Sequence, residues 1–272
     1  MDTIKRHPVF AYYALALVIS WTIWAPLVAI KQRWLDLPIP FALHYLGAFG
    51  PMVSALIVTA LTRGAPGLRE LWGRIIKWRV GIAWFLFAAL SPIALFLIAA
   101  VIAWLITGKF ADLVLLGQAN YLPYLGIGVL PVWLATYGFG EEIGWRGFAL
   151  PRLQKTMSVS RATLILGLLW AIWHTPAFFY LDTFERIGFV FLPGFLIGVL
   201  FGAVLFTWIY NGSGGSVLMV SLWHGLYDLL TASLAAQGLI TILMSAGVIV
   251  WGLLITNVDC PGNFHRVEKQ TL

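Results

Sequence analysis

Apolar residues follow one another along this chain in long runs, and short polar segments interrupt them. A helix that spans a bilayer needs roughly 20 predominantly apolar residues. Runs of about that length cover residues 10–30, 39–62, 81–107, 121–150, 162–180, 187–210, 216–235 and 238–256. The pattern predicts an all-α membrane protein, a polytopic bundle of about eight transmembrane helices. The division between the last two runs is the least distinct, because very few residues separate them.

The composition supports this prediction and excludes an ordinary soluble fold. Hydrophobic residues make up 61% of the 272 residues and charged residues only 10%, whereas soluble domains are roughly 25% charged. No polar stretch is long enough to form a separate water-soluble core, so we interpret residues 1–272 as one membrane domain. The first run is longer than the roughly 7–15 residue core of a cleavable signal peptide and is interpreted as a spanning helix.

The basic residues lie in the segments between the apolar runs, where they indicate orientation. The net charge is +6, but its placement favours a lipid bilayer and not a nucleic acid as the partner. With the amino terminus in the cytoplasm, 13 of the 17 Lys and Arg residues lie on the cytoplasmic side. We therefore expect both termini in the cytoplasm, and the compact loops favour a prokaryotic plasma membrane. Contact of segment 63–79 with anionic headgroups is an alternative explanation of its charges.

A few ionisable residues fall inside the predicted spans, where each costs a few kcal/mol and is a functional candidate by default. They are His44, Glu141, Glu142, Arg146, His174, His224 and Asp228. At 1.5 Å per residue, Glu141, His174 and His224 lie roughly 16, 18 and 12 Å from the cytoplasmic ends of their helices. Three costly side chains at similar depth predict one intramembrane polar site, open to the cytoplasmic side. His44 has no partner at a suggestive spacing, so we interpret it as structural.

Local spacing adds detail to this predicted site. Glu142 and Arg146 are four residues apart and can form a structural ion pair, while Glu141 points roughly 100° away. His224 and Asp228 are also four apart, so both face one cavity. Glycines at 138, 140, 144 and 147 suit the close approach of neighbouring helices.

These residues resemble a known family. Segment 141–146, EEIGWR, is similar to the EExxxR motif of the CAAX-protease and bacteriocin-processing (CPBP) intramembrane proteases. Segments 170–174 and 224–228 are similar to that family's second and third motifs, which places its core at about 121–230. Two positions depart from the usual pattern: Trp170 replaces a Phe, which we interpret as a change at a packing position, and Asp228 replaces an Asn.

The resemblance implies an intramembrane endopeptidase whose partner is a membrane-associated peptide or protein, such as a CAAX-type prenylated tail, a leader peptide or a membrane regulator. It implies that Glu141 activates water with His174, and that His224 and Asp228 stabilise the oxyanion. Asp228 in place of Asn replaces a hydrogen-bond donor by an acid. A non-catalytic immunity or binding protein is the main alternative. A proton-coupled transporter is less favoured, because the sequence lacks the internal repeats typical of transporters.

The cofactor requirement stays open at this point. Glu141, His174 and His224 would form a catalytic zinc set, but the HExxH signature is absent from the sequence. The resemblance is compatible with a metalloprotease or a metal-independent glutamate protease. We favour a reaction for which the metal is dispensable.

Overall fold

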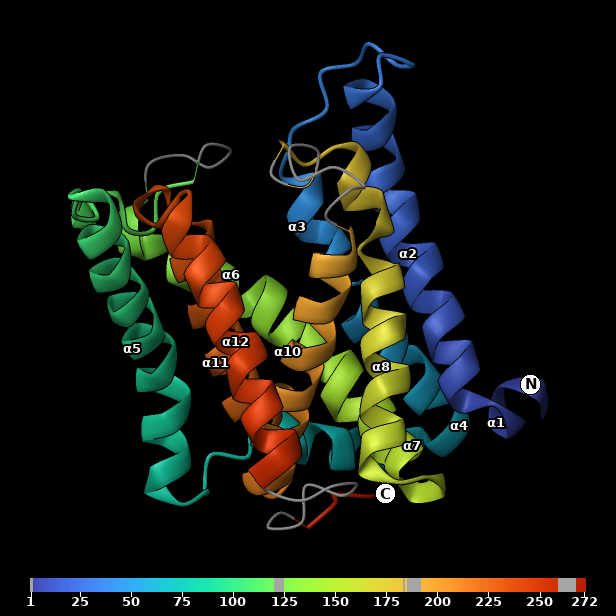
Figure 1. Cartoon of the computed structure of the whole chain (residues 1–272). Coiled ribbons are helices and arrows are strands. Elements are labelled where there is room, and N and C mark those ends of the chain that lie inside the picture. Colours follow the sequence, from blue (N-terminus) through green and yellow to red (C-terminus); the bar gives the residue numbers. More distant parts are fainter. Residues whose placement is uncertain (1, 120–124, 183, 185–191, 259–267) are drawn as a thin grey trace.

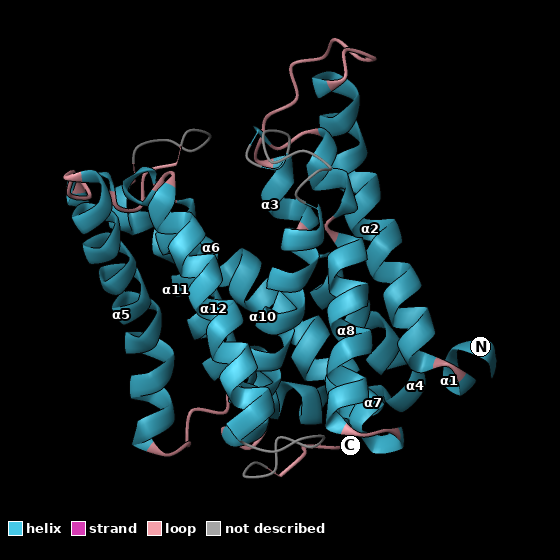
Figure 2. Cartoon of the chain, in the orientation of Figure 1, coloured by secondary structure: helices cyan, strands magenta, loops and turns pink. Residues whose placement is uncertain are grey.

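The structure is a computed structural model, and it describes residues 2–119, 125–182, 184, 192–258 and 268–272. This described part is helical and contains no strand (Figure 2). The α-helices are α1 (Asp2–Arg6), α2 (Pro8–Lys31), α3 (Leu43–Gly47), α4 (Gly50–Ile75), α5 (Ile82–Thr107), α6 (Leu130–Trp133), α7 (Leu150–Thr156), α8 (Val159–Trp173), α10 (Leu192–Gly212), α11 (Val217–Ala232) and α12 (Leu239–Val258). The predicted all-α class is confirmed.

Six helical stretches in the described residues are long and apolar enough to cross a membrane: Pro8–Lys31, Leu43–Ile75, Ile82–Thr107, Val159–Phe179, Leu192–Gly212 and Leu239–Asn257. The seventh predicted span corresponds to the shorter apolar helix α11. Large apolar side chains such as Leu86, Leu90 and Leu105 are exposed on the outside of the bundle. In lipid this exposure is not penalised, so the structure is that of a polytopic helical membrane protein. The first residues of the run 187–210 lie outside the described part.

The fourth predicted span is an irregular helix at the centre of the bundle. After η2 (Gly126–Val129) and α6, two π-helical stretches, η3 (Leu134–Glu141) and η4 (Ile143–Ala149), continue into α7. Its glycines allow close contact with α11. At Gly138 a side chain would not fit, because a Cβ atom there would lie 2.7 Å from the backbone oxygen of Ser221. The Ser221 hydroxyl donates to the Gly138 carbonyl at 3.0 Å. π-Helical turns are wider than α-helical ones and often occur at functional sites.

Serine caps set the start of the two helices that carry the predicted histidines. The Ser158 side chain accepts a hydrogen bond from Arg161 N before α8, and the Ser216 side chain accepts one from Met219 N before α11. Such caps satisfy backbone donors that a helix leaves unpaired at its first turn. The predicted last two spans are separated by η7 (Leu234–Ala236) between α11 and α12.

The segment after the second predicted span is helical, where we expected a connecting loop. Helix α4 bends at Gly64, whose φ of 59° lies in the left-handed region, and then continues to Ile75. Leu71 and Ile75 are buried four residues apart, while Arg69 is exposed. This amphipathic pattern favours a helix with one face packed against the bundle.

Helix α1, residues 64–75 of α4, α7 and residues 268–272 lie at the same end of the bundle (Figure 1). We call this the basic end, because it carries many of the Arg and Lys residues. Gln154 of α7 donates to the carbonyl of Gln270 at 2.9 Å, which holds the tail against α7. The two ends of the described chain therefore lie on one side, as an even number of spans requires.

Candidate functional site

A buried ion pair occupies the centre of the irregular helix. Arg146 Nη1 donates to both carboxylate oxygens of Glu142, at 2.8 and 3.0 Å. Both side chains are completely buried. The guanidinium also lies 4.7 Å from the ring centres of Trp170 and Phe206. An isolated charge in such a place costs several kcal/mol, and the pairing offsets that cost.

His224 extends this pair into a chain of charged groups. Its Nδ1 lies 3.0 Å from Glu142 Oε1, and its Nε2 lies 3.3 Å from Asp228 Oδ2. A neutral imidazole has one donor nitrogen, and ionised carboxylates only accept. The Nδ1 contact is a hydrogen bond to Glu142, and the Nε2 contact with Asp228 is an ion pair when the ring is protonated. The Asp228 side chain is 27% exposed while that of Glu142 is 0%, so the chain runs from the core towards an accessible surface.

Glu141 points to a different neighbour, the indole of Trp170. Trp170 Nε1 donates to Glu141 Oε2 at 2.7 Å, and both residues are buried. Our interpretation of position 170 as a packing position was therefore incomplete, because a Phe cannot donate this bond. Part of the signal was available in the sequence, because a buried indole N–H needs an acceptor, but the packing of the helices decided which acceptor it meets.

His174 follows the last residue of α8 and completes the group around Trp170. Its Nδ1 lies 2.7 Å from the carbonyl oxygen of Trp170, which can only accept, so Nδ1 carries the proton and Nε2 is left as an acceptor. The rings of His174 and His224 each lie 5.6 Å from the Trp170 ring. Trp170 thus contacts Glu141, His174 and His224, the three residues expected at similar depth.

His44 has partners that its sequence context did not reveal. Its Nδ1 lies 2.7 Å from the Tyr180 hydroxyl and its Nε2 lies 2.6 Å from the Tyr137 hydroxyl. These bonds join α3 to η3 and to the residue after η5 (Thr175–Phe179). With both ring nitrogens satisfied, His44 fits a structural role.

The arrangement does not fit the zinc set that the sequence suggested. In the described part of the chain, no three His, Cys, Asp or Glu residues are grouped so that they could hold a metal ion. Both nitrogens of His224 face carboxylate oxygens, and a histidine ligand needs one nitrogen free for the metal. The Trp170 indole also occupies one oxygen of Glu141.

Comparison with known proteins gives a family match and a similar curated protein. The family model of type II CAAX prenyl endopeptidase Rce1-like proteins matches residues 122–230. A curated relative from Methanococcus maripaludis, CAAX prenyl protease 2, is 27% identical over 118 residues. The matched part covers 42% of this chain and 41% of that relative, so it spans less than half of either protein.

The fold and the buried cluster define a polytopic helical membrane protein with acids and histidines gathered between its helices. Within that class, residues 122–230 match the Rce1-like family model, which supports the resemblance to the CAAX-protease and bacteriocin-processing family. The matched segment contains every residue that carried the resemblance: Glu141, Glu142, Arg146, His174, His224 and Asp228.

Proposed function

We propose that this protein is an intramembrane endopeptidase that hydrolyses a membrane-associated peptide or protein with water activated by Glu141. One observation carries the proposal: the buried Glu141 carboxylate accepts a hydrogen bond from Trp170, and the Trp170 ring also contacts His174 and His224, inside the segment that matches a family of prenyl endopeptidases. Helix packing does not require a carboxylate there, and a buried acid is costly in a membrane, so its presence favours a chemical role.

The proposed reaction uses the groups around Trp170. Glu141 takes a proton from water, the water oxygen bonds to the peptide carbonyl carbon, and the C–N bond breaks as Glu141 returns the proton to the leaving nitrogen. His174 holds the same water through its Nε2 acceptor. His224, held at Nδ1 by Glu142, provides an N–H for the oxyanion. Asp228 keeps the imidazole in place until the substrate binds.

The proposed substrate class is suggested by the name of the relative. The Methanococcus relative is named a CAAX prenyl protease, so a prenylated tail is the first candidate, ahead of a leader peptide or a membrane regulator. The site would open to the cytoplasm of a prokaryotic cell, because 13 of 17 basic residues favour cytoplasmic termini. Reporter fusions at Asp2 and Leu272 test this orientation, and a non-cytoplasmic signal from either would contradict it.

The decisive experiment compares wild-type protein with Glu141→Gln in liposomes that contain a quenched prenyl-cysteine peptide. Loss of a general base should slow cleavage by about 10²–10⁴-fold. Glu268→Gln, the same change at an exposed tail position, should leave the rate unchanged.

A membrane proteomic comparison of the same strains covers other substrates, since a new amino terminus should appear only when Glu141 is intact. Full cleavage by purified Glu141→Gln would exclude Glu141 as the base. Absence of any Glu141-dependent terminus would favour the non-catalytic binding protein.

The donor set predicts that no metal ion is required. Because both His224 nitrogens already face carboxylates, we expect cleavage to continue after exhaustive chelation, in protein that elemental analysis shows to be free of metal. Activity lost to the chelator and recovered with zinc would overturn this part of the proposal.

A further inference from the structure

The basic end of the bundle contains a cavity that the proposed reaction does not use. It has a volume of about 570 Å³, which falls in the usual range of ligand pockets. Its walls come from the α1–α2 junction, the end of the first half of α4, α7 and the tail. The lining residues are Arg6, His7, Pro8, Val9, Phe10, Arg63, Arg152, Leu153, Lys155, Thr156 and Leu272.

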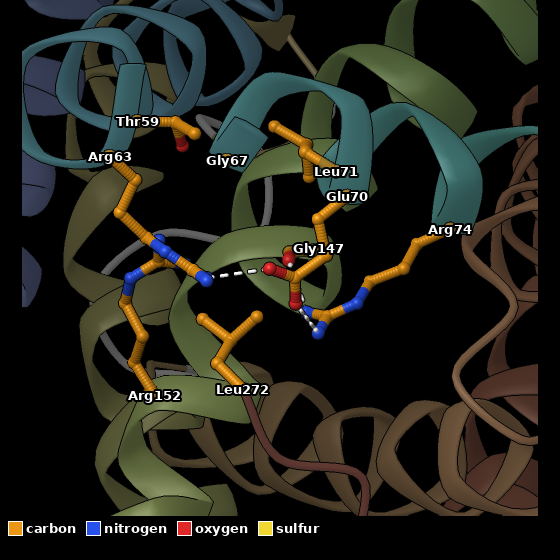
Figure 3. Close-up of a pocket in the computed structure, with 9 residues that line it drawn as sticks. All are labelled: Thr59, Arg63, Gly67, Glu70, Leu71, Arg74, Gly147, Arg152 and Leu272. Atoms are coloured by element: carbon orange, nitrogen blue, oxygen red, sulfur yellow. Dashed lines mark hydrogen bonds and ion pairs between the residues drawn. The ribbon is translucent and has the colours of Figure 1, made fainter. Parts of the chain in front are cut away.

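The lining is strongly basic. Four of its side chains are Arg or Lys, and none is Asp or Glu. The adjoining small cavity contains Glu70, but Arg63 and Arg74 both pair with that carboxylate, each at 2.7 Å (Figure 3). Glu70 therefore neutralises part of the positive charge in the small cavity. The basic residues of the larger cavity remain in excess.

Arg152 is a cation of this cavity that has no direct carboxylate partner among the described residues. In Figure 3 it comes from α7 towards Arg63. Its Nη1 donates to the Phe148 carbonyl at 2.9 Å, and its guanidinium lies 3.6 Å from the Phe148 ring centre. Burial, together with Arg63 and Arg74, lowers the pKa of Arg152 to about 10. Within the described residues no carboxylate lies within ion-pair distance of Arg152. An anion bound in the cavity would stabilise the positive charge of Arg152.

The apolar part of the lining indicates which kind of anion fits. Val9 and Phe10 begin the first spanning helix, and the Phe10 side chain is 73% exposed. Leu153 adds a further apolar side chain from α7. A free phosphate would use the arginines and leave this apolar wall unused. A phospholipid would use both, because its phosphate lies at the level of the basic residues and its acyl chains lie along the span.

We propose that the cavity between Arg6, Arg63, Arg152 and Lys155 binds the headgroup phosphate of an anionic phospholipid. The contacts of Arg152 give this site a connection to the irregular helix, because Phe148 belongs to η4, the π-helical stretch that contains Arg146. Arg74 donates to the Gly147 carbonyl of the same stretch at 3.3 Å. The proposal stands independently of the peptidase reaction.

The test measures lipid retention by the purified full-length chain with native mass spectrometry, using phosphatidylglycerol and phosphatidylcholine as probes. Wild-type protein should retain phosphatidylglycerol preferentially. Arg152→Gln should weaken that preference about fivefold, because one basic residue near an anionic membrane surface is worth roughly 1 kcal/mol. Arg6→Gln combined with Lys155→Gln changes two exposed positions and should weaken it further.

The matched control is Arg161→Gln, an exposed arginine at the start of α8 that does not line the cavity. It should retain the wild-type preference. An equal loss in Arg161→Gln would mean general surface attraction and would overturn the site, as would the absence of any preference in the wild type. Inorganic phosphate alone should not raise the melting temperature as phosphatidylglycerol does; an equal rise would identify a free-phosphate site and contradict the lipid.

Discussion

The buried charged residues around Glu142 and the basic end of the bundle differ in how their charges are balanced. In the core, the side chains of Glu142 and Arg146 are both 0% exposed, and Glu142, Arg146, His224 and Asp228 form a continuous set of contacts between opposite charges. At the basic end, the side chains of Arg63 and Glu70 are 43% and 35% exposed. There, Glu70 faces two arginines and Arg152 has only a carbonyl and a ring.

The difference follows from the surroundings of each region. An unpaired charge in a low-dielectric interior costs several kcal/mol, so the core contains charges in matched sets. At the membrane boundary water and headgroups solvate an excess charge, so it persists and can attract an anion. Charge balance therefore indicates a working site in the core, and charge excess indicates a binding surface at the boundary.

The largest expected difference between the regions is in stability. Arg146→Ala leaves Glu142 buried without its main partner and should lower the free energy of unfolding by about 3–5 kcal/mol. Arg63→Ala breaks a half-exposed pair of the same type and should cost about 1 kcal/mol or less. Unfolding of both variants in one detergent measures the two costs. Equal losses would show that burial does not distinguish the two pairs.

A smaller effect concerns the contact between Glu141 and Trp170. Trp170→Phe removes the indole donor and keeps an aromatic ring, so kcat/KM should fall by about 10–150-fold, the equivalent of a hydrogen bond to a charged group worth about 1.5–3 kcal/mol. Trp24→Phe is the matched control, because that buried indole donates to the His44 carbonyl at 2.9 Å. The control should keep its rate. Unchanged cleavage by Trp170→Phe would show that the hydrogen bond to Glu141 is not needed and that Trp170 serves only in packing.

The smallest effect is expected at Asp228, whose side chain is the most exposed among Glu142, Arg146, His224 and Asp228. Asp228→Asn keeps an acceptor near His224 Nε2 but removes the negative charge, so cleavage should slow by about tenfold, the difference between a charged and a neutral hydrogen bond. Asp228→Ala should be slower still, because no acceptor is left. Rates for the three proteins across pH measure this order. An Asn variant as active as the wild type would instead assign Asp228 a donor role.

Sequence reasoning predicted the features that depend on neighbours along one helix. Apolar runs indicated the spans, and helical periodicity placed Glu142 beside Arg146 and His224 beside Asp228, since residues four apart share a face. The irregular π-helical stretches and the continuation of α4 beyond Gly64 were not predicted. The π-helical turns depend on how closely other helices pack against that segment, whereas the helix beyond Gly64 follows an amphipathic pattern that our reading of long apolar runs did not detect.

Only the tertiary structure decided which of these groups meet across helices. Glu142 and His224 are 82 positions apart in the sequence, and Glu141 and Trp170 are 29 apart. The sequence by itself determined the class of fold and indicated the candidate residues, because length and hydropathy set the first and intramembrane charge indicates the second. It did not determine that Trp170 bonds Glu141 or that Arg152 faces a cavity, because helix rotation and the distance between helix axes come from the packing of the whole bundle.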